Sequence, residues 1–160
     1  VQDFQDVVNV NLVGSFIVAK EAAARMKTVG TGAIINITSM GGIHPAPGSG
    51  AYGGTTSGLS PLNLSFFVES GPFAIRVHAV APGFIDAGMY APFFKDEAVR
   101  KQRGSGVPLR RLGTATDVAK AVMFLASDDA AYISGQEIAI DGGVINSVLA
   151  QLPREQPAAQ

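Results

Sequence analysis

Ala33-Ile-Ile-Asn-Ile-Thr-Ser39 is the stretch on which the fold prediction depends. Its apolar residues, from Ala33 to Ile37, show no regular alternation with polar ones, which is typical of a strand buried on both faces of a parallel sheet. Two further apolar runs, Ile75–Val80 and Ile138–Ile140, close on turn sequences that contain Pro or Gly. The sequence therefore predicts about three buried strands.

Helical segments are expected between these strands. Apolar residues recur with a helical period over residues 4–27 and again over 51–69, and a third helix is predicted after the cap candidates Thr114 and Thr116. Residues 84–113 read as a long irregular excursion, of a kind that often holds substrate. Helices that alternate with buried strands favour an α/β fold, in which ligands bind beyond the carboxyl ends of parallel strands.

Composition fits one such domain, expected over residues 1–150 of the 160, with residues 151–160 as a disordered tail that holds no site. Twelve basic and thirteen acidic residues give a net charge of -1, so we expect no nucleic-acid partner and no acidic membrane partner. Uninterrupted apolar runs are also too short to span a bilayer. The chain has no cysteine, which is typical of a reducing compartment, so we expect a cytoplasmic protein without a metal site.

Candidate chemical residues follow two of the predicted strands. Thr38-Ser39 ends the first, Tyr52 lies thirteen residues after Ser39, and Pro82-Gly83 lies thirty residues after Tyr52. With the sequences at 9–12 (Asn-Val-Asn-Leu), 76–85 and 124–135, this spacing resembles the short-chain dehydrogenase/reductase family from about Val7 to Val144. The resemblance implies the C-terminal portion of a Rossmann-like, doubly wound parallel sheet, without the family's N-terminal dinucleotide-binding half.

The resemblance also implies roles for particular residues. Ser39 would polarise a substrate carbonyl, Tyr52 would be the acid/base, and Asn11 would position a relay water. Hydride would pass between the nicotinamide of NAD or NADP and a small carbonyl compound or secondary alcohol. Tyr52 and the backbone of Pro82, Gly83, Phe84 and Ile85 would contact this cofactor. Family members commonly pair through two long helices, which implies a homo-oligomer through residues 4–27 and 51–69.

Three departures from the family pattern weaken the expectation of activity. Thr56 stands where the family has a lysine, and Ala87 stands where a threonine often contacts the nicotinamide carboxamide. The glycine-rich turn that holds the pyrophosphate at a helix N-terminus has no counterpart before Val1, so we expect weak cofactor binding. Residues 48–53 fit G-x-G-x-x-G, but they do not follow directly on a strand and are expected to be a flexible lead into the next helix.

Alternatives therefore stay open at this point. The chain is an oxidoreductase, a catalytically inactive scaffold or dimer partner, or a truncated fragment of an active enzyme. Tyr90, Phe93 and Phe94 either line a substrate pocket or cover the core. For His78 we favour a structural hydrogen bond within the core over a catalytic role, because a single histidine forms neither a metal site nor a triad. Asn11 is either the relay residue or only a polar helix residue.

Overall fold

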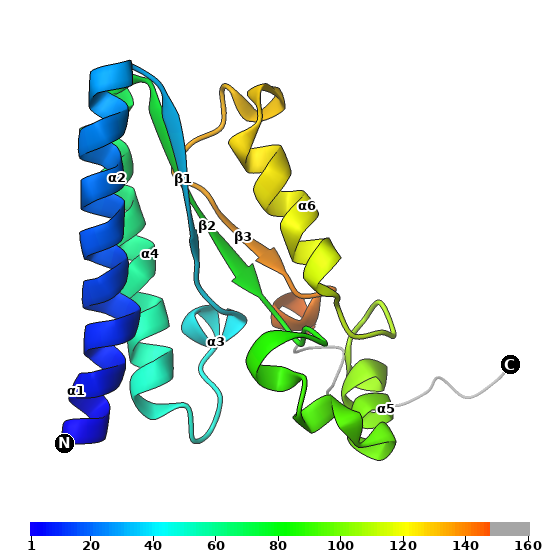
Figure 1. Ribbon diagram of the computed structural model, residues 1–160. Coiled ribbons are helices and arrows are strands. Elements are labelled where there is room, and N and C mark those ends of the chain that lie inside the picture. The colour runs from blue at the N-terminus through cyan, green and yellow to red at the C-terminus, as the bar shows by residue number, and fades with distance from the viewer. Residues whose placement is uncertain (148–160) are drawn as a thin grey trace, which may run out of the picture.

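A three-stranded parallel sheet forms the centre of the computed structural model, which describes residues 1–147 (Figure 1). Its order is β1 (Gly32–Ile37), β2 (Ile75–Pro82) and β3 (Glu137–Ile140). The pairing of Ile34 with Val77 and of Val80 with Ile138 fixes the register. The three predicted strands and the α/β class are confirmed, whereas the predicted disorder of 151–160 lies outside the described residues.

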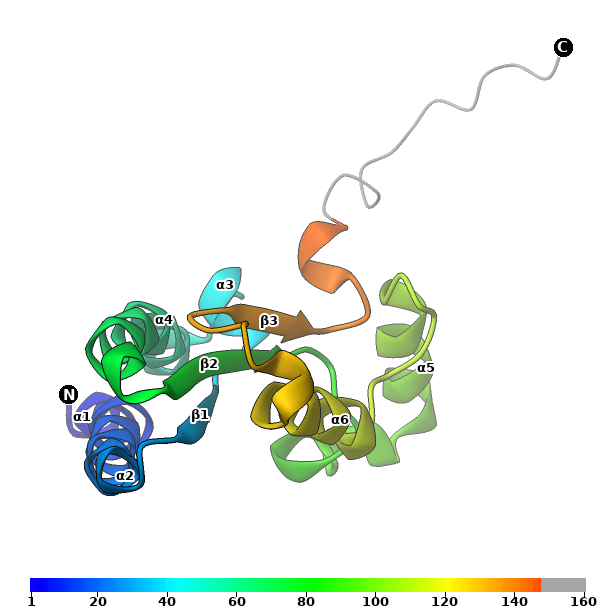
Figure 2. The same ribbon diagram turned by 90° about the horizontal axis from the view of Figure 1, so that it is seen from above.

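Helices cover both faces of the sheet (Figure 2). One face carries the continuous helix Gln2–Val29, which consists of α1 (Gln2–Val8), the π-helical turn η1 (Asn9–Gly14) and α2 (Ser15–Val29), together with α4 (Gly50–Ser70). The other face carries α6 (Ala115–Ala126). The remaining helices are α3 (Met40–Ile43), α5 (Glu97–Gly106) and five short 3-10 turns at Gly71–Phe73, Gly88–Tyr90, Phe93–Lys95, Asp128–Ala130 and Val144–Asn146.

Alternate residues of β2 join the sheet to its two helical layers, as the period of two in a strand requires. Ile75 and Val77 are buried in the core cluster that contains Ala19, Ala23 and Phe66 of the helical layer. Arg76 points to the opposite face, where its guanidinium donates to the carbonyls of Leu125, Ala126 and Ser127. These carbonyls belong to the last turn of α6 and have no partner inside the helix, so Arg76 caps that helix end.

The helix Gln2–Val29 is long and apolar enough to cross a membrane by length and composition alone, with a mean hydropathy of 1.3 in its best 18-residue window. Polar residues interrupt its apolar ones, so the length of its unbroken apolar runs did not predict this property. Core helices of water-soluble proteins meet the same criterion. Only 11% of this window is buried inside the fold, where Phe16 packs on Phe66 of α4 with ring centroids 5.6 Å apart. We assign the helix no membrane role.

Residues 84–113 are less irregular than predicted, because α5 lies within them. The carboxylate of Asp96 accepts hydrogen bonds from the backbone N–H groups of Ala98 and Val99, at 2.9 and 3.4 Å, and so caps the first turn. The helix EAVRKQRGSG has few apolar residues and two glycines, so hydrophobic periodicity did not reveal it. The prediction of a wholly irregular excursion is therefore wrong.

The start of α6 follows the prediction at Thr114, whereas Thr116 lies inside the helix. Thr114 Oγ1 accepts from the N–H of Asp117 at 3.2 Å, and Asp117 Oδ2 accepts from the N–H of Thr114 at 2.8 Å, which is a capping box. Arg111 donates to both carboxylate oxygens of Asp117, at 2.7 and 3.1 Å. The Arg111 guanidinium and the Thr114 donors hold the pKa of Asp117 well below its usual value.

His78 is fully buried on β2, and the backbone carbonyls of Ile133 and Gln136 are its neighbouring acceptors. Neither ring nitrogen reaches a partner among the described residues with full hydrogen-bond geometry, so the predicted structural hydrogen bond stays a prediction. The neighbouring carbonyl of Gln136 already accepts from the N–H of Ala79 at 2.9 Å. Burial, followed by the charge of Arg76, lowers the pKa of His78 below its ordinary value of 6.5.

Replacing His78 with leucine is expected to remove an acid sensitivity of the fold. When the pH falls through 6.5, the unfolded chain takes up a proton that the buried imidazole refuses, so the free energy of unfolding of the parent chain falls. Leucine has no proton to take up and leaves no unpaired polar atom. Urea unfolding of both proteins at about pH 7.5 and about pH 5.5 measures this difference. An equal loss of stability on acidification in both proteins would contradict the assignment to His78.

Candidate active site

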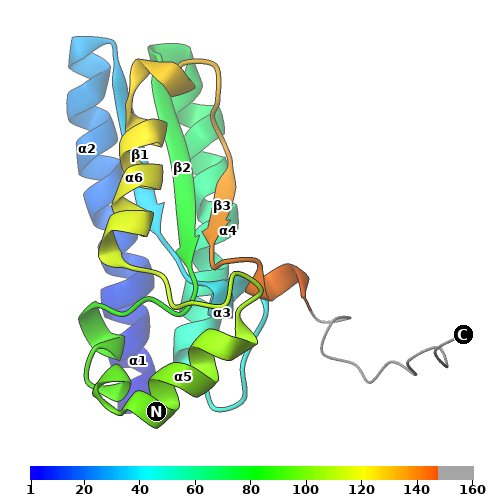
Figure 3. The same ribbon diagram turned by 90° about the vertical axis from the view of Figure 1, so that its right-hand side faces the viewer.

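All three strands end on the side of the sheet where α3, α5 and the turn Val144–Asn146 lie (Figure 3). A cavity of about 640 Å³ opens there. Ser39, at the end of β1, and Tyr52, in the first turn of α4, both line it. The turn after β2 contributes Gly83 and Phe84 to the same wall. The two predicted catalytic side chains therefore face one space.

Ser39 is held in place by the way α3 begins. Ser39 is the N-cap residue of α3, in an extended conformation, and its Oγ accepts from the N–H of Gly41 at 3.0 Å. The preceding residue, Thr38, donates its N–H to the carbonyl of Val80 at 2.8 Å, which continues the β1–β2 pairing. Capping uses a lone pair of the Ser39 oxygen and leaves its hydrogen to be donated, as polarisation of a carbonyl requires.

Gly41 lies between the two catalytic candidates. A Cβ on this glycine would stand 3.4 Å from Ser39 Oγ and 3.9 Å from Tyr52 Cε1, so the hydroxyl and the phenol ring flank a single point. The absence of a side chain at Gly41 keeps that point open. Because both atoms lie within 4 Å of that point, the Ser39 hydroxyl and the Tyr52 ring are near neighbours on the same side of α3.

Asn11 lies near Tyr52 but does not line the cavity. Its Nδ2 donates to Thr55 Oγ1 at 3.3 Å, and Thr55 Oγ1 in turn donates to the carbonyl of Tyr52 at 3.0 Å. Asn11 sits in the π-helical turn η1, and Ser15 Oγ bonds its carbonyl at 2.7 Å. Single π-helical turns inside α-helices are frequent at functional sites. The relay role of Asn11 stays a prediction.

The turn at the end of β2, residues 82–85, is the one predicted to contact the cofactor, and it packs closely against the end of β3. Gly83 donates its N–H to the carbonyl of Ile140 at 3.0 Å, and a Cβ on Gly83 would stand only 2.7 Å from Cα and Cβ of Asp141, so no larger residue fits. Pro82 is the last residue of β2 and pairs with Ile140. Phe84 and Ile85 also border a second cavity of about 580 Å³. Backbone close to both cavities fits contact with a flat ring such as a nicotinamide.

Thr56, at the position of the family lysine, does not reach the cavity. It is 5% exposed, and its Oγ1 donates to the carbonyl of Tyr52 at 2.8 Å, with the carbonyl of Gly53 at 3.2 Å. The same oxygen lies 3.0 Å from where a Cβ of Gly42 would stand, so Thr56 packs beneath α3. The helical turn below the phenol therefore carries no cation.

Tyr90, Phe93 and Phe94 line the cavity, and Phe94 is at the same time buried at 4% exposure, so their role in binding a substrate stays a prediction. The rings of Tyr90 and Phe94 stack with centroids 5.9 Å apart, and Phe93 tilts against Tyr90 at 6.2 Å. His44 and Arg103 complete the polar lining, and sequence reasoning did not select them. The helix that carries Arg103 was itself not predicted.

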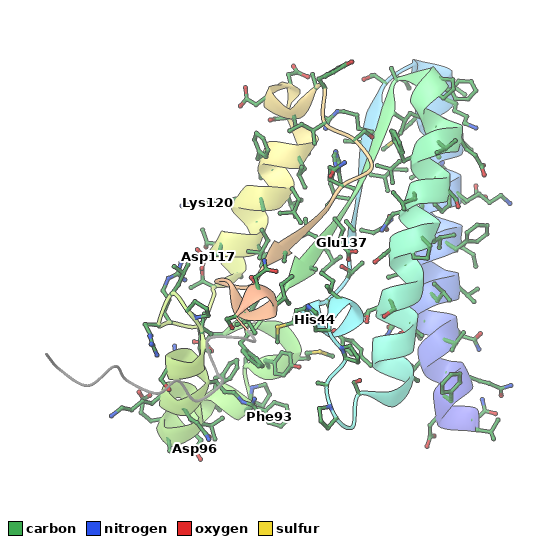
Figure 4. All side chains as sticks on the ribbon, turned by 180° about the vertical axis from the view of Figure 1, so that it is seen from behind. His44, Phe93, Asp96, Asp117, Lys120 and Glu137 are labelled. Atoms are coloured by element: carbon green, nitrogen blue, oxygen red, sulfur yellow. The ribbon has the colours of Figure 1, made fainter. Side chains whose placement is uncertain are left out.

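Glu137 is a further residue that sequence reasoning missed (Figure 4). Its Oε1 accepts from Thr38 Oγ1 at 2.6 Å and its Oε2 accepts from Ser60 Oγ at 2.5 Å. The carboxylate thus joins β3 both to α4 and to the residue before Ser39. A charged residue at the start of the otherwise apolar run Ile138–Ile140 was the available signal.

Alanine substitutions at the two neighbouring glycines of α3 are expected to differ in their effect on stability. A Cβ at Gly42 would stand 2.8 Å from the carbonyl carbon of Thr56 and 2.9 Å from the N of Ser57, so α3 must separate from α4. We expect Gly42→Ala to cost about 1–3 kcal/mol and lower Tm by several degrees. Gly41→Ala makes only ordinary contacts and should leave Tm nearly unchanged. Thermal melts followed by circular dichroism compare the two, and equal melting temperatures would refute this packing argument.

The G-x-G-x-x-G match at 48–53 follows a loop after α3 and runs into α4, and no strand directly precedes it. Gly48 and Gly50 adopt positive φ angles of 78° and 45°, which suits a turn that leads into a helix. The rejection of this segment as a dinucleotide fingerprint is supported. The phosphate-binding turn of the family is thus not found in residues 1–147.

Comparison with known proteins agrees with this arrangement. A family model described as Enoyl-(Acyl carrier protein) reductase matches residues 1–145. The 3-oxoacyl-[acyl-carrier-protein] reductase FabG of Thermotoga maritima is 38% identical over 144 residues, which cover 90% of this chain and 58% of that protein. The corresponding protein of Rickettsia felis is 41% identical over 147 residues, which cover 90% and 59%. The chain therefore spans less than two thirds of the length of these relatives.

Solved structures with a similar fold are also dehydrogenases or reductases. A gluconate 5-dehydrogenase from Burkholderia cenocepacia, in complex with NADP and tartrate, superposes with a TM-score of 0.86 at 28% identity, covering 92% of this chain and 58% of that one. A short-chain type dehydrogenase/reductase from Mycobacterium ulcerans superposes with a TM-score of 0.86 at 32% identity, covering 91% and 53%. By sequence, by fold and by the placement of Ser39 and Tyr52, this chain belongs to the short-chain dehydrogenase/reductase family.

Proposed function

We propose that this chain carries the substrate-binding and proton-transfer part of an NAD(P)-dependent oxidoreductase that interconverts a carbonyl and a secondary alcohol. One observation carries the proposal. Ser39 and Tyr52 line a single cavity beyond the carboxyl ends of the strands, and both lie next to Gly41. Ligands of open parallel sheets bind at that edge.

The residues present divide the chemistry between them. A bound reduced nicotinamide would supply the hydride that the carbonyl carbon receives. The Ser39 hydroxyl donates a hydrogen bond to the carbonyl oxygen and stabilises the charge that develops there. The Tyr52 phenol gives its proton to that oxygen, so an alcohol and the oxidised cofactor result. In the oxidative direction Tyr52 takes the proton back.

The cavity and its walls fit one end of such a cofactor. Gly83, Phe84 and Tyr52 border a space of about 640 Å³, within the range of small-molecule sites. Residues 1–147 contain no glycine-rich turn of the kind that binds a pyrophosphate. We therefore expect the affinity for NADH or NADPH to be weak. The choice between NAD and NADP normally depends on residues near that turn.

Relatives support the reaction class by their names. They include 3-oxoacyl-[acyl-carrier-protein] reductases, a gluconate 5-dehydrogenase with NADP and an acetoin dehydrogenase from Salmonella typhimurium, all of which interconvert C=O and CH–OH groups. We propose the same class of reaction for the present chain. We do not transfer the substrate of any one relative to it. A cytoplasmic location is proposed with it.

We further propose a homo-oligomer through helices 4–27 and 51–69. Large apolar side chains are exposed on both helices, among them Val10, Ile17 and Val18 on the first and Leu64 and Val68 on the second. Apolar surface of this extent is typical of contacts with another polypeptide. The interface does not depend on catalysis, so it suits either an enzyme or a scaffold.

A catalytically inactive scaffold or dimer partner is the second candidate, and Thr56 is the observation that favours it. The side chain is buried and bonded to its own helix, so no cation assists Tyr52 from this position. Retention of both Ser39 and Tyr52 in one cavity favours chemistry instead.

The test compares the 160-residue chain with a fusion in which the amino-terminal segment of the Thermotoga maritima relative precedes it. Binding of NADPH is followed by fluorescence, and its oxidation is followed across a panel of ketones. We expect the chain alone to bind NADPH more weakly than micromolar, and the fusion to bind it and reduce at least one ketone. A Ser39→Ala fusion is the matched control. A folded fusion that binds NADPH but reduces no ketone would favour the scaffold.

A further inference from the structure

Arg103 is the cationic residue of the cavity that holds Ser39 and Tyr52. It lies in the last turn of α5, and its guanidinium lies over the ring of Phe84, 5.1 Å from the centroid. Two neighbouring arginines have acidic partners, because Arg100 pairs with Asp86 and Arg111 pairs with Asp117. Arg110, which does not line the cavity, donates to the carbonyl of Ser105 at 2.6 Å. Within residues 1–147, Arg103 forms no ion pair.

The charge of Arg103 is not balanced inside the cavity. Among the described lining residues there is no aspartate or glutamate, and His44 is the other basic side chain. An exposed arginine in the last turn of a helix is often only solvated there, because it suits the helix dipole. Arg103 differs in that its guanidinium lies over the ring of Phe84 at the cavity, a cation–π contact that leaves its N–H groups available to an anion.

The remaining walls are apolar and aromatic. Phe94 is buried at 4% exposure, whereas Phe93 and Tyr90 are 64% and 37% exposed at the cavity rim. Figure 4 labels two lining residues, His44 beyond the end of α3 and Phe93 in the segment before α5. A ligand in this space therefore meets hydroxyl groups at Ser39 and Tyr52, aromatic rings along its length and a cation at Arg103.

We propose that the site selects a carbonyl substrate with an apolar or aromatic body and an anionic group, and that Arg103 binds this group. The inference rests on the proposed function, which places the reacting carbonyl between Ser39 and Tyr52. The fork of the guanidinium matches both a carboxylate and a phosphate with two parallel hydrogen bonds. Charge-assisted hydrogen bonds of this kind make Arg103 a specificity residue that binds the substrate away from the reacting atoms.

Binding to the full 160-residue chain tests this without cofactor or turnover. The probes are 4-oxo-4-phenylbutanoate and butyrophenone, two aryl ketones in which a carboxylate of the first replaces a methyl of the second. Their affinities are measured by titration followed by NMR amide shifts. Arg103→Gln is compared with Lys101→Gln, which removes the same charge from the same helix at a residue that does not line the cavity. Inorganic phosphate as a competitor distinguishes a site for any anion from one that prefers a carboxylate.

We expect the keto acid to bind the parent chain about tenfold more tightly than butyrophenone, and Arg103→Gln to remove that preference. Lys101→Gln should keep it. Displacement of the keto acid by phosphate would assign the shared anion site to phosphate esters as well. Equal affinity for the two ketones, no binding of the keto acid, or an equal loss in both variants would overturn the proposal. Failure of the fusion to reduce ketones would leave these affinities unaffected, so the two proposals fail separately.

Discussion

Changing Tyr52 to phenylalanine is expected to lower kcat for ketone reduction by the fusion by about 10²–10⁴-fold. Phenylalanine keeps the ring that borders the cavity but removes the proton that the forming alkoxide requires. Tyr52 lies in the first turn of α4, and the bonds that hold this turn involve its backbone carbonyl, which accepts from Thr55 and Thr56. The substitution should therefore leave the fold unchanged. Because the ring stays in the cavity wall, the affinity for NADPH should change far less than kcat.

Kinetics and ligand binding separate this outcome from a structural effect. Tm, the Kd for NADPH and the KM for the ketone are measured for both fusions. Tm should be unchanged, and kcat should change far more than Kd or KM. Ser39→Ala should also lower kcat, because it removes a donor to the same oxygen. Retention of more than about a tenth of the parent kcat by Tyr52→Phe would show that another group supplies the proton. His44 lines the same cavity and would then be the first alternative to examine.

Local patterns were sufficient to predict the parts of the fold that depend on burial. β1 and β2 read as apolar runs because both faces of a parallel sheet are covered, and the structure places them within two residues of the predicted bounds. Ser39 and Tyr52 could be paired because their spacing and flanking residues resemble the short-chain dehydrogenase/reductase pattern, whereas strand geometry alone places only Ser39, since Tyr52 lies in α4. For the strands, the apolar run seen in the sequence is a direct result of burial on both faces of the sheet.

Features that depend on tertiary contacts could not be read in this way. α5 has little apolar periodicity and is held by the Asp96 cap and by the pairing of Arg100 with Asp86. The acceptors next to His78, the carbonyls of Ile133 and Gln136, lie more than fifty residues along the chain, so no local pattern identifies them. The links from Glu137 to Thr38 and Ser60 join residues 99 and 77 positions apart, which no local pattern records.

Introducing lysine at Thr56 is expected to raise kcat of the fusion about tenfold or more, and to give the chain alone no activity. A cation one helical turn after Tyr52 favours the ionised form of the phenol and so assists proton exchange with the substrate oxygen. The gain requires bound cofactor, because without hydride transfer no alkoxide forms. The pH profile of kcat for ketone reduction is the decisive measurement. kcat falls when Tyr52 loses the proton that it donates, and this fall should move to lower pH in Thr56→Lys.

This substitution also has a structural consequence that can be measured separately. Thr56 is 5% exposed and packs beneath α3 at Gly42, so a lysine must extend past α3 to bring its ammonium to the cavity. Burial of an unpaired cation should lower Tm of the chain alone. Thr56→Met has a similar length without the charge, and it should share any packing effect but leave kcat and its pH profile unchanged. If methionine raised kcat as much as lysine, the gain would come from the shape of the α3–α4 contact. The lack of a cation near Tyr52 would then not be the reason for a low kcat.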